Sequence, residues 1–190
     1  VYETHNYGLD EDEDYSNQDN NPSDIEGHGT HCSGISGADS NNTIGVAGVC
    51  WNCKIMPLRA GYKLQNNVTG NWGGSLAVDS ILSSLEYAVD NNATIISMSF
   101  GTYSDISSIE DAINSAYNSG SILIASSGND DTTSESYPAA YNNVISVSAT
   151  TSGDEKASYS NYGSWVDLSA PGNSIYSTCY NDTYCSKQGT

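Results

Sequence analysis

The chain has 190 residues, enough for one hydrophobic core of ordinary size but short for two. Five Lys and Arg residues against 23 Asp and Glu residues give a formal net charge of −18. This charge argues against nucleic acid or an anionic membrane surface as a partner, because both are polyanions. The sequence shows neither an apolar run of about 18 residues nor a signal peptide, so we expect a single acidic domain outside the membrane.

The acidic residues are concentrated near the start of the chain. Nine of the 23 lie in residues 1–26, with an unbroken run from Asp10 to Asp14, and the first basic residue is Lys54. Such a run cannot pack in a core without counter-ions. It also lacks the D-x-D-x-D-G spacing of a calcium loop, so we interpret residues 1–26 as a solvated acidic region and residues 27–190 as the core of the domain.

Apolar runs alternate with stretches of helical period from residue 54 onward. They predict, in chain order, a strand at 54–59, a helix at 75–92, a strand at 95–99, a helix at 106–118, and strands at 122–125 and 144–148. This alternation is typical of right-handed βαβ crossovers. We therefore predict an α/β fold, a doubly wound parallel sheet with helices on both faces, in which sites gather at the carboxyl ends of the strands.

Two kinds of segment carry the candidate chemistry. The expected strand ends run into Ser99-Phe100-Gly101 and Ser126-Ser127-Gly128-Asn129, whose small residues let a ligand come close to the backbone. Upstream, His28 and His31 lie between glycines and could bind a metal, act as general bases or simply start a helix. A zinc site needs a third ligand and the only other histidine is His5, so acid–base chemistry ranks above metal binding.

Five segments follow one another in the order of the motifs of the subtilisin-like serine proteases, and the chain resembles this family from Gly27 to its last residue. These segments are Gly27-His28-Gly29-Thr30-His31-Cys32-Ser33-Gly34-Ile35, Ile96-Ser97-Met98-Ser99-Phe100-Gly101, Ala125-Ser126-Ser127-Gly128-Asn129, Ser169-Ala170-Pro171-Gly172 and Gly189-Thr190. The resemblance implies a subtilisin-like fold and a serine endopeptidase that cleaves protein or peptide substrates through an acyl-enzyme intermediate.

The resemblance also assigns roles to single residues. His28 matches the histidine that takes the proton of the nucleophile and returns it to the leaving amine, and Asn129 matches the side-chain amide donor to the oxyanion. His31, one helical turn after His28, is expected to face inward as a structural histidine. A turn-forming role after Gly128 is the alternative for Asn129.

Substrate would bind as an extended strand between two edges of the chain. On the resemblance, Ser99, Phe100 and Gly101 form one edge, and Gly70, Asn71 and Trp72 form the other. The walls of the first specificity pocket would be Ser99–Gly101 together with Ser126, Ser127 and Gly128. All of these except Phe100 are small residues, so we expect broad specificity with a preference for an apolar or aromatic side chain in this pocket.

Two members of the expected catalytic triad do not occur in the sequence. The family's nucleophilic serine follows Gly-Thr directly, and the chain ends at Thr190; no apolar strand carrying the triad aspartate precedes His28. We therefore expect an incomplete, truncated peptidase domain whose partners include the rest of the same domain, and an inactive chain in isolation. An inactive peptide-binding remnant is the alternative, and a calcium-dependent scaffold is the third interpretation.

A calcium loop is implied after the histidine helix. Residues 40–46 resemble the loop in which Asn42 gives its side-chain oxygen, and Ser40, Ile44 and Val46 their carbonyls, to a structural Ca²⁺. A carboxylate from elsewhere would complete this site.

Five cysteines cannot all pair within the chain. Short spacings favour the disulfides Cys50–Cys53 and Cys179–Cys185, with redox or zinc chemistry as the rival for the first pair. The resemblance to the thiol-containing branch of the family then implies a buried free Cys32 beneath the histidine. We accordingly expect an oxidising compartment and a secreted protein.

Overall fold

A computed structural model describes residues 23–24, 26–65 and 72–190, so the acidic run at Asp10 to Asp14 lies outside the described residues. The contacts divide the chain into two compact units. Unit 1 comprises the described parts of Val1–Tyr87 together with Tyr176–Cys185, and unit 2 comprises Ala88–Ile175 and Ser186–Thr190.

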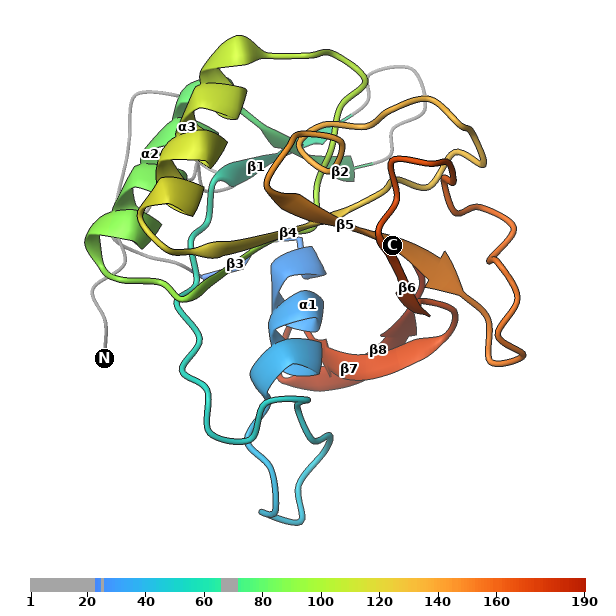
Figure 1. Ribbon diagram of the computed structural model, residues 1–190. Coiled ribbons are helices and arrows are strands. Elements are labelled where there is room, and N and C mark those ends of the chain that lie inside the picture. Colours follow the sequence, from blue (N-terminus) through green and yellow to red (C-terminus); the bar gives the residue numbers. More distant parts are fainter. Residues whose placement is uncertain (1–22, 25, 66–71) are drawn as a thin grey trace. The chain divides into compact units, whose positions relative to one another are not determined.

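The described residues form three helices and eight strands (Figure 1). In chain order they are α1 (His28–Gly37), β1 (Gly61–Gln65), β2 (Trp72–Leu76), α2 (Val78–Asp90), β3 (Ile95–Met98), α3 (Ser107–Asn118), β4 (Ile122–Ser126), β5 (Val144–Thr150), β6 (Leu168–Pro171), β7 (Ile175–Cys179) and β8 (Thr183–Lys187).

Unit 2 is built on a parallel sheet. Its four strands are in the order β3-β4-β5-β6, and every neighbouring pair is parallel, with Met98 opposite Ala125 and Ser126 opposite Val147. Helix α3 contacts β4 and buries residues spaced at i, i+4 and i+7, which are Ile109, Ile113 and Ala116. The predicted βαβ arrangement is therefore present in this unit.

The sequence pattern predicted one helix and three strands of unit 2 correctly. The predicted helix at 106–118 and the strands at 95–99, 122–125 and 144–148 correspond to α3, β3, β4 and β5. Gly120, at φ 97°, takes the left-handed conformation just beyond α3, where a glycine removes the steric cost of ending a helix.

Two sequence predictions need correction. Helix α2 begins at Val78 rather than at residue 75, because Ser75 and Leu76 belong to β2, which pairs antiparallel with β1. Residues 54–59 form no strand. A strand requires a ladder of backbone hydrogen bonds, and Pro57 has no N–H to donate to one.

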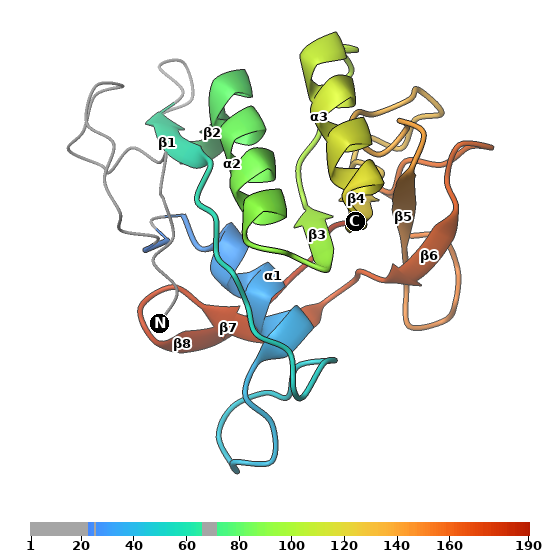
Figure 2. The ribbon, with the colours of Figure 1, turned by 60° about the vertical axis from the view of Figure 1, so that its left-hand side comes forward.

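Unit 1 contains a helix packed tightly on a hairpin. Helix α1 lies against the β7–β8 hairpin, as both ribbon views show (Figure 2). The hydroxyl of Ser177 donates to the carbonyl of His31 at 2.9 Å, and the hydroxyl of Thr178 donates to the carbonyl of Thr30 at 2.8 Å. These bonds fix the first turns of α1 by side chains that lie almost 150 residues away in sequence.

The predicted disulfides are present. Cys50 is bonded to Cys53, and Cys179 to Cys185, which closes the β7–β8 hairpin. Cys32 takes part in neither disulfide, as expected, but it is partly exposed rather than buried. Within the part of the chain that the structure describes, no helix combines the length and apolar character that a membrane crossing needs.

Candidate active site

The carboxyl ends of β3 and β4 bring two predicted substrate segments together. Because these strands are adjacent and parallel, Ser99–Gly101, which follows β3, and Ser126–Gly128, which begins at the last residue of β4, lie at the same edge of the sheet. A third segment joins them, since Thr102 and Tyr137 exchange backbone hydrogen bonds of 2.9 and 2.8 Å. The two predicted pocket walls therefore lie next to each other in unit 2.

Ser136 lies between these walls. A Cβ added to Gly101 would be 2.6 Å from the Ser136 hydroxyl oxygen, and one added to Gly128 would be 3.7 Å from it. Ser136 is buried, with 4% of its surface exposed. The sequence did not indicate Ser136 as a site residue, because a serine before Tyr137-Pro138 is typical of an ordinary loop.

The Asn129 side chain is fixed beside the last residue of the chain. Its carbonyl oxygen Oδ1 accepts a hydrogen bond from the Thr190 backbone N–H at 3.0 Å and another from the Thr190 hydroxyl at 3.3 Å. The same hydroxyl accepts from the Gly128 N–H at 3.1 Å. Since Oδ1 is engaged as an acceptor, the amide nitrogen Nδ2 is the donor that Asn129 presents elsewhere.

A second network lies behind the same loop. The Tyr103 hydroxyl donates to a carboxylate oxygen of Asp130 at 2.5 Å and accepts from the side chain of Asn161 at 3.1 Å. The hydrogen bond to Asp130, with a smaller contribution from burial, raises the pKa of the Tyr103 hydroxyl above its usual value. The residues that flank Asn129 are thereby linked to the segment that follows Gly101.

His28 begins α1 in unit 1, and Asp24 caps this helix. The Asp24 carboxylate accepts from the backbone N–H groups of Glu26, Gly27 and Thr30 and from the Thr30 hydroxyl, at 2.7 to 2.9 Å. Partial burial alone would raise the pKa of Asp24, but the hydrogen bonds from Gly27 and Thr30 outweigh it and hold the pKa below its usual value.

The two histidines of α1 differ in exposure. His28 is exposed, and its Nε2 atom lies 3.7 Å from the sulfur of Cys32. His31 is buried, with 4% of its surface exposed, as expected for a structural histidine. This difference fits a reactive role for His28 and a packing role for His31.

The loop after α1 contains the four candidate calcium ligands. Asn41, Thr43 and Gly45 have positive φ values of 61°, 63° and 59°, so left-handed residues alternate with the candidate ligands. Oδ1 of Asn42 accepts from the Ile44 N–H at 2.9 Å and has a second lone pair for a cation. The candidate donors of Ser40, Asn42, Ile44 and Val46 are all oxygen atoms, which suits Ca²⁺. The described residues contain no cluster of three His, Cys, Asp or Glu side chains that could hold a metal.

The structure describes only part of the second predicted substrate edge, Gly70–Trp72. Gly70 and Asn71 lie outside the described residues, and Trp72 begins β2. His28 belongs to unit 1 and Asn129 to unit 2.

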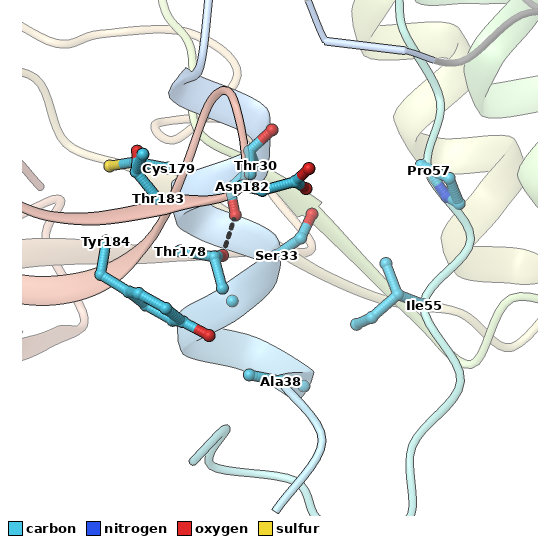
Figure 3. A pocket seen from close by; sticks show the side chains of 12 residues that line it. Thr30, Ser33, Ala38, Ile55, Pro57, Thr178, Cys179, Asp182, Thr183 and Tyr184 are labelled. Atoms are coloured by element: carbon cyan, nitrogen blue, oxygen red, sulfur yellow. Dashed lines mark hydrogen bonds between the residues drawn. The ribbon is translucent and has the colours of Figure 1, made fainter. Parts of the chain in front are cut away.

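Unit 1 also contains a cavity of about 580 Å³ (Figure 3). Its lining comes from one side of α1, from the segment with Ile55 and Pro57, and from the β7–β8 hairpin, including Asp182 and Tyr184. None of the predicted site residues lines it.

The family model described as the Subtilase family matches residues 2–190, and the chain belongs to this family. The predicted family and subtilisin-like α/β fold are thereby confirmed.

Named relatives and a solved structure agree with this assignment. Thermitase from Thermoactinomyces vulgaris is 40% identical over 177 residues, which are 93% of this chain and 60% of thermitase. Subtilisin Savinase from Lederbergia lenta is 39% identical, over 88% of this chain and 58% of its own length. The crystal structure of a cold adapted subtilisin-like serine proteinase matches with a TM-score of 0.77 and 29% identity, over 90% of this chain and 58% of that one. The chain thus spans three-fifths or less of these relatives.

Proposed function

We propose that residues 1–190 are part of a single subtilisin-type peptidase domain and that the full-length protein is a serine endopeptidase. It hydrolyses peptide bonds through an acyl-enzyme intermediate, with broad specificity and a preference for apolar or aromatic side chains in the first pocket. The isolated chain of 190 residues is inactive, because it holds neither the nucleophile nor the triad aspartate.

One observation carries this proposal: the side-chain amide of Asn129 is held against Gly189-Thr190. The Thr190 N–H and hydroxyl both donate to Asn129 Oδ1. In the family motif the nucleophilic serine follows this Gly-Thr pair. The Nδ2 donor of Asn129 would therefore lie close to the carbonyl that the serine attacks, which is where an oxyanion donor is needed.

The remaining steps follow from the assigned roles. His28 takes the proton of the serine hydroxyl as its oxygen attacks the substrate carbonyl, and the Asn129 Nδ2 group donates to the oxygen as it gains negative charge. His28 then gives the proton to the leaving amine, and water releases the acyl group by the same route in reverse. Segments Ser99–Gly101 and Gly70–Trp72 hold the substrate backbone as an added strand.

The pocket preference follows from size and charge. Ser126, Ser127, Gly128 and the glycine at position 101 are small, and the buried Ser136 between them is uncharged. Such walls offer no counter-charge for a basic or acidic side chain, which favours an apolar one. A set of peptide substrates that differ only at this position tests the preference, and faster cleavage after Asp or Lys than after Phe or Leu would contradict it.

Calcium and secretion are parts of the same proposal. The oxygen donors of residues 40–46 would hold a structural Ca²⁺, which contributes a fixed positive charge that ties this loop to α1. Two disulfides within the described chain support an oxidising compartment, and one relative is named the minor extracellular protease Epr from Bacillus subtilis. We therefore propose that the protein is secreted.

The decisive test uses the full-length protein. A His28→Ala variant is expected to lose turnover of a peptide anilide by a factor of about 10⁴ or more while its thermal unfolding stays unchanged. Ordinary turnover in this variant would refute the assignment of His28. The residue after Thr190 in the complete gene separates the enzyme from an inactive peptide-binding remnant: serine supports the enzyme, and any other residue overturns it.

A further inference from the structure

Asn161 is a completely buried amide with an exposed fraction of 0%. It lies between β5 and β6, outside every segment that the sequence marked as functional. Burying an amide is costly unless its donors and acceptors are all paired. The partners of Asn161 therefore show what this position does.

All four hydrogen-bonding positions of the amide are used. The Nδ2 group donates to the Ser127 carbonyl at 2.9 Å and to the Tyr103 hydroxyl at 3.1 Å. The Oδ1 atom accepts from the backbone N–H of Asp130 at 2.9 Å and from that of Thr132 at 3.3 Å. Three of these four partners belong to the single loop 127–132, which contains Asn129.

Backbone contacts of Asn161 hold the same loop. The Asn161 N–H donates to the Gly128 carbonyl at 2.9 Å, and the Ser127 hydroxyl donates to the Asn161 carbonyl at 3.3 Å. Gly128 has a φ of 105°, and a Cβ at this position would overlap the Nδ2 atom of Asn161. The loop therefore bends tightly around the Asn161 side chain, with bonds to the residues on both sides of Asn129.

We propose that Asn161 is a positioning residue that fixes the orientation of the Asn129 amide for oxyanion stabilisation; this inference rests on the proposed function. An oxyanion donor works only if it is already in place when charge develops. A displacement of about 1 Å can cost a factor of about 10² in rate. Thr190 holds the Asn129 side chain from one side, and Asn161 holds the backbone on either side of it.

A double-mutant cycle on the full-length protein tests this coupling, with kcat and KM measured on a peptide anilide. Asn129→Ala is expected to lower kcat by about 10²–10³ with little change in KM. Asn161→Ala is expected to lower kcat by about 10–10², with a smaller rise in KM because Asn161 also holds the pocket residues Ser127 and Gly128. In the Asn129→Ala background, Asn161→Ala should lower kcat by less than about threefold, because the group that it positions is already gone.

Ser146→Ala is the matched control. Ser146 is also completely buried; its hydroxyl accepts from the Asp167 N–H at 2.9 Å and donates to the Trp165 carbonyl at 2.7 Å, and neither contact involves Asn161 or loop 127–132. This variant should lower the unfolding temperature while kcat stays within about threefold of the parent value. A matching loss of kcat in Ser146→Ala would mean that any buried defect here slows turnover, and it would overturn the proposal.

Tyr103→Phe covers the case in which Asn161→Ala does not fold. Tyr103 is 49% exposed, so its hydroxyl can be removed with little effect on the core, yet this removes one acceptor of Asn161 Nδ2. We expect a loss in kcat of a few fold that disappears in the Asn129→Ala background.

The outcomes separate the two proposals. If Asn129→Ala leaves kcat unchanged, the oxyanion role of Asn129 is wrong and the role of Asn161 falls with it. If Asn129→Ala slows turnover but Asn161→Ala and Tyr103→Phe cost the same factor in both backgrounds, only the positioning role is refuted.

Discussion

The contact between α1 and β7 leaves no room for a side chain at Gly34. A Cβ on Gly34 would overlap the Thr178 hydroxyl oxygen and lie 2.5 Å from the Ser177 hydroxyl oxygen. Both hydroxyls already donate to carbonyls of α1. A Gly34→Ala substitution must therefore displace either the helix or these two side chains, and both changes break the hydrogen bonds.

The cost can be worked out from these contacts. Overpacking by one methyl group costs about 1–3 kcal/mol. Each of the two hydrogen bonds contributes about 1 kcal/mol, and alanine regains about 1 kcal/mol over glycine in helix propensity. We therefore expect Gly34→Ala to lower the free energy of unfolding by about 2–4 kcal/mol, which corresponds to a fall in Tm of roughly 5–15 °C.

Gly29→Ala provides the matched control in the same helix. Among the described residues, a Cβ on Gly29 meets only one atom within 4 Å, an Asp24 carboxylate oxygen at 3.7 Å, which is an ordinary contact. Both substitutions are made in the full-length His28→Ala protein, so that self-digestion does not distort the unfolding curves. Guanidinium unfolding should show a stability loss in the Gly34 variant and a small gain or no change in the Gly29 variant. Equal stabilities of the two variants would refute the close packing of α1 on β7.

Further predictions concern the cap, the hairpin and the calcium loop. Asp24→Ala should lower the free energy of unfolding by about 1–2 kcal/mol near neutral pH. The pKa of Asp24 in the folded protein lies below its usual 3.8, so the stabilisation by its carboxylate is complete above pH 3.8. This stabilisation is lost as the pH falls through the lower pKa of the folded protein, and the stabilities of parent and variant should therefore converge in acid. Replacing both Cys179 and Cys185 by serine should cost about 2 kcal/mol in urea unfolding, and an unchanged midpoint would show that the hairpin closes without the bond. Adding Ca²⁺ after chelation should raise the Tm of the parent protein and raise the Tm of Asn42→Ala much less. Equal increases in Tm would show that the cation binds at another site.

The sheet of unit 2 was predictable where apolar residues are continuous along the chain. Ile122–Ala125 is a run of four apolar residues, and β4 buries Leu123 and Ala125 and partly buries Ile124. By contrast, all four residues of β6 are exposed, so Leu168–Pro171 carries no apolar run that marks a strand. The sequence therefore contains an apolar run that predicts β4 and no such run that predicts β6.

The candidate site shows a similar division. Asn129 and His28 were found because each lies in a recognisable segment. Asn161 was not found, since its partners Tyr103, Ser127 and Asp130 lie 31 to 58 residues away in sequence. In sequence, an asparagine between a serine and a tyrosine in a polar stretch is typical of an exposed turn. Only the folded loop shows that this amide is buried.

Among the described hydrogen bonds, those that hold the start of α1 and those that hold the Asn129 loop involve different residues. Helix α1 depends on the Asp24 cap and on the hydroxyls of Ser177 and Thr178, all within unit 1. The Asn129 loop depends on Asn161 and on the last residue of the chain, all within unit 2. Residues with no shared partner have nearly additive effects, whereas residues in one network do not. A loss of turnover caused by Asp24→Ala should therefore multiply with one caused by Asn161→Ala, although the loss from Asn161→Ala disappears once Asn129 is removed.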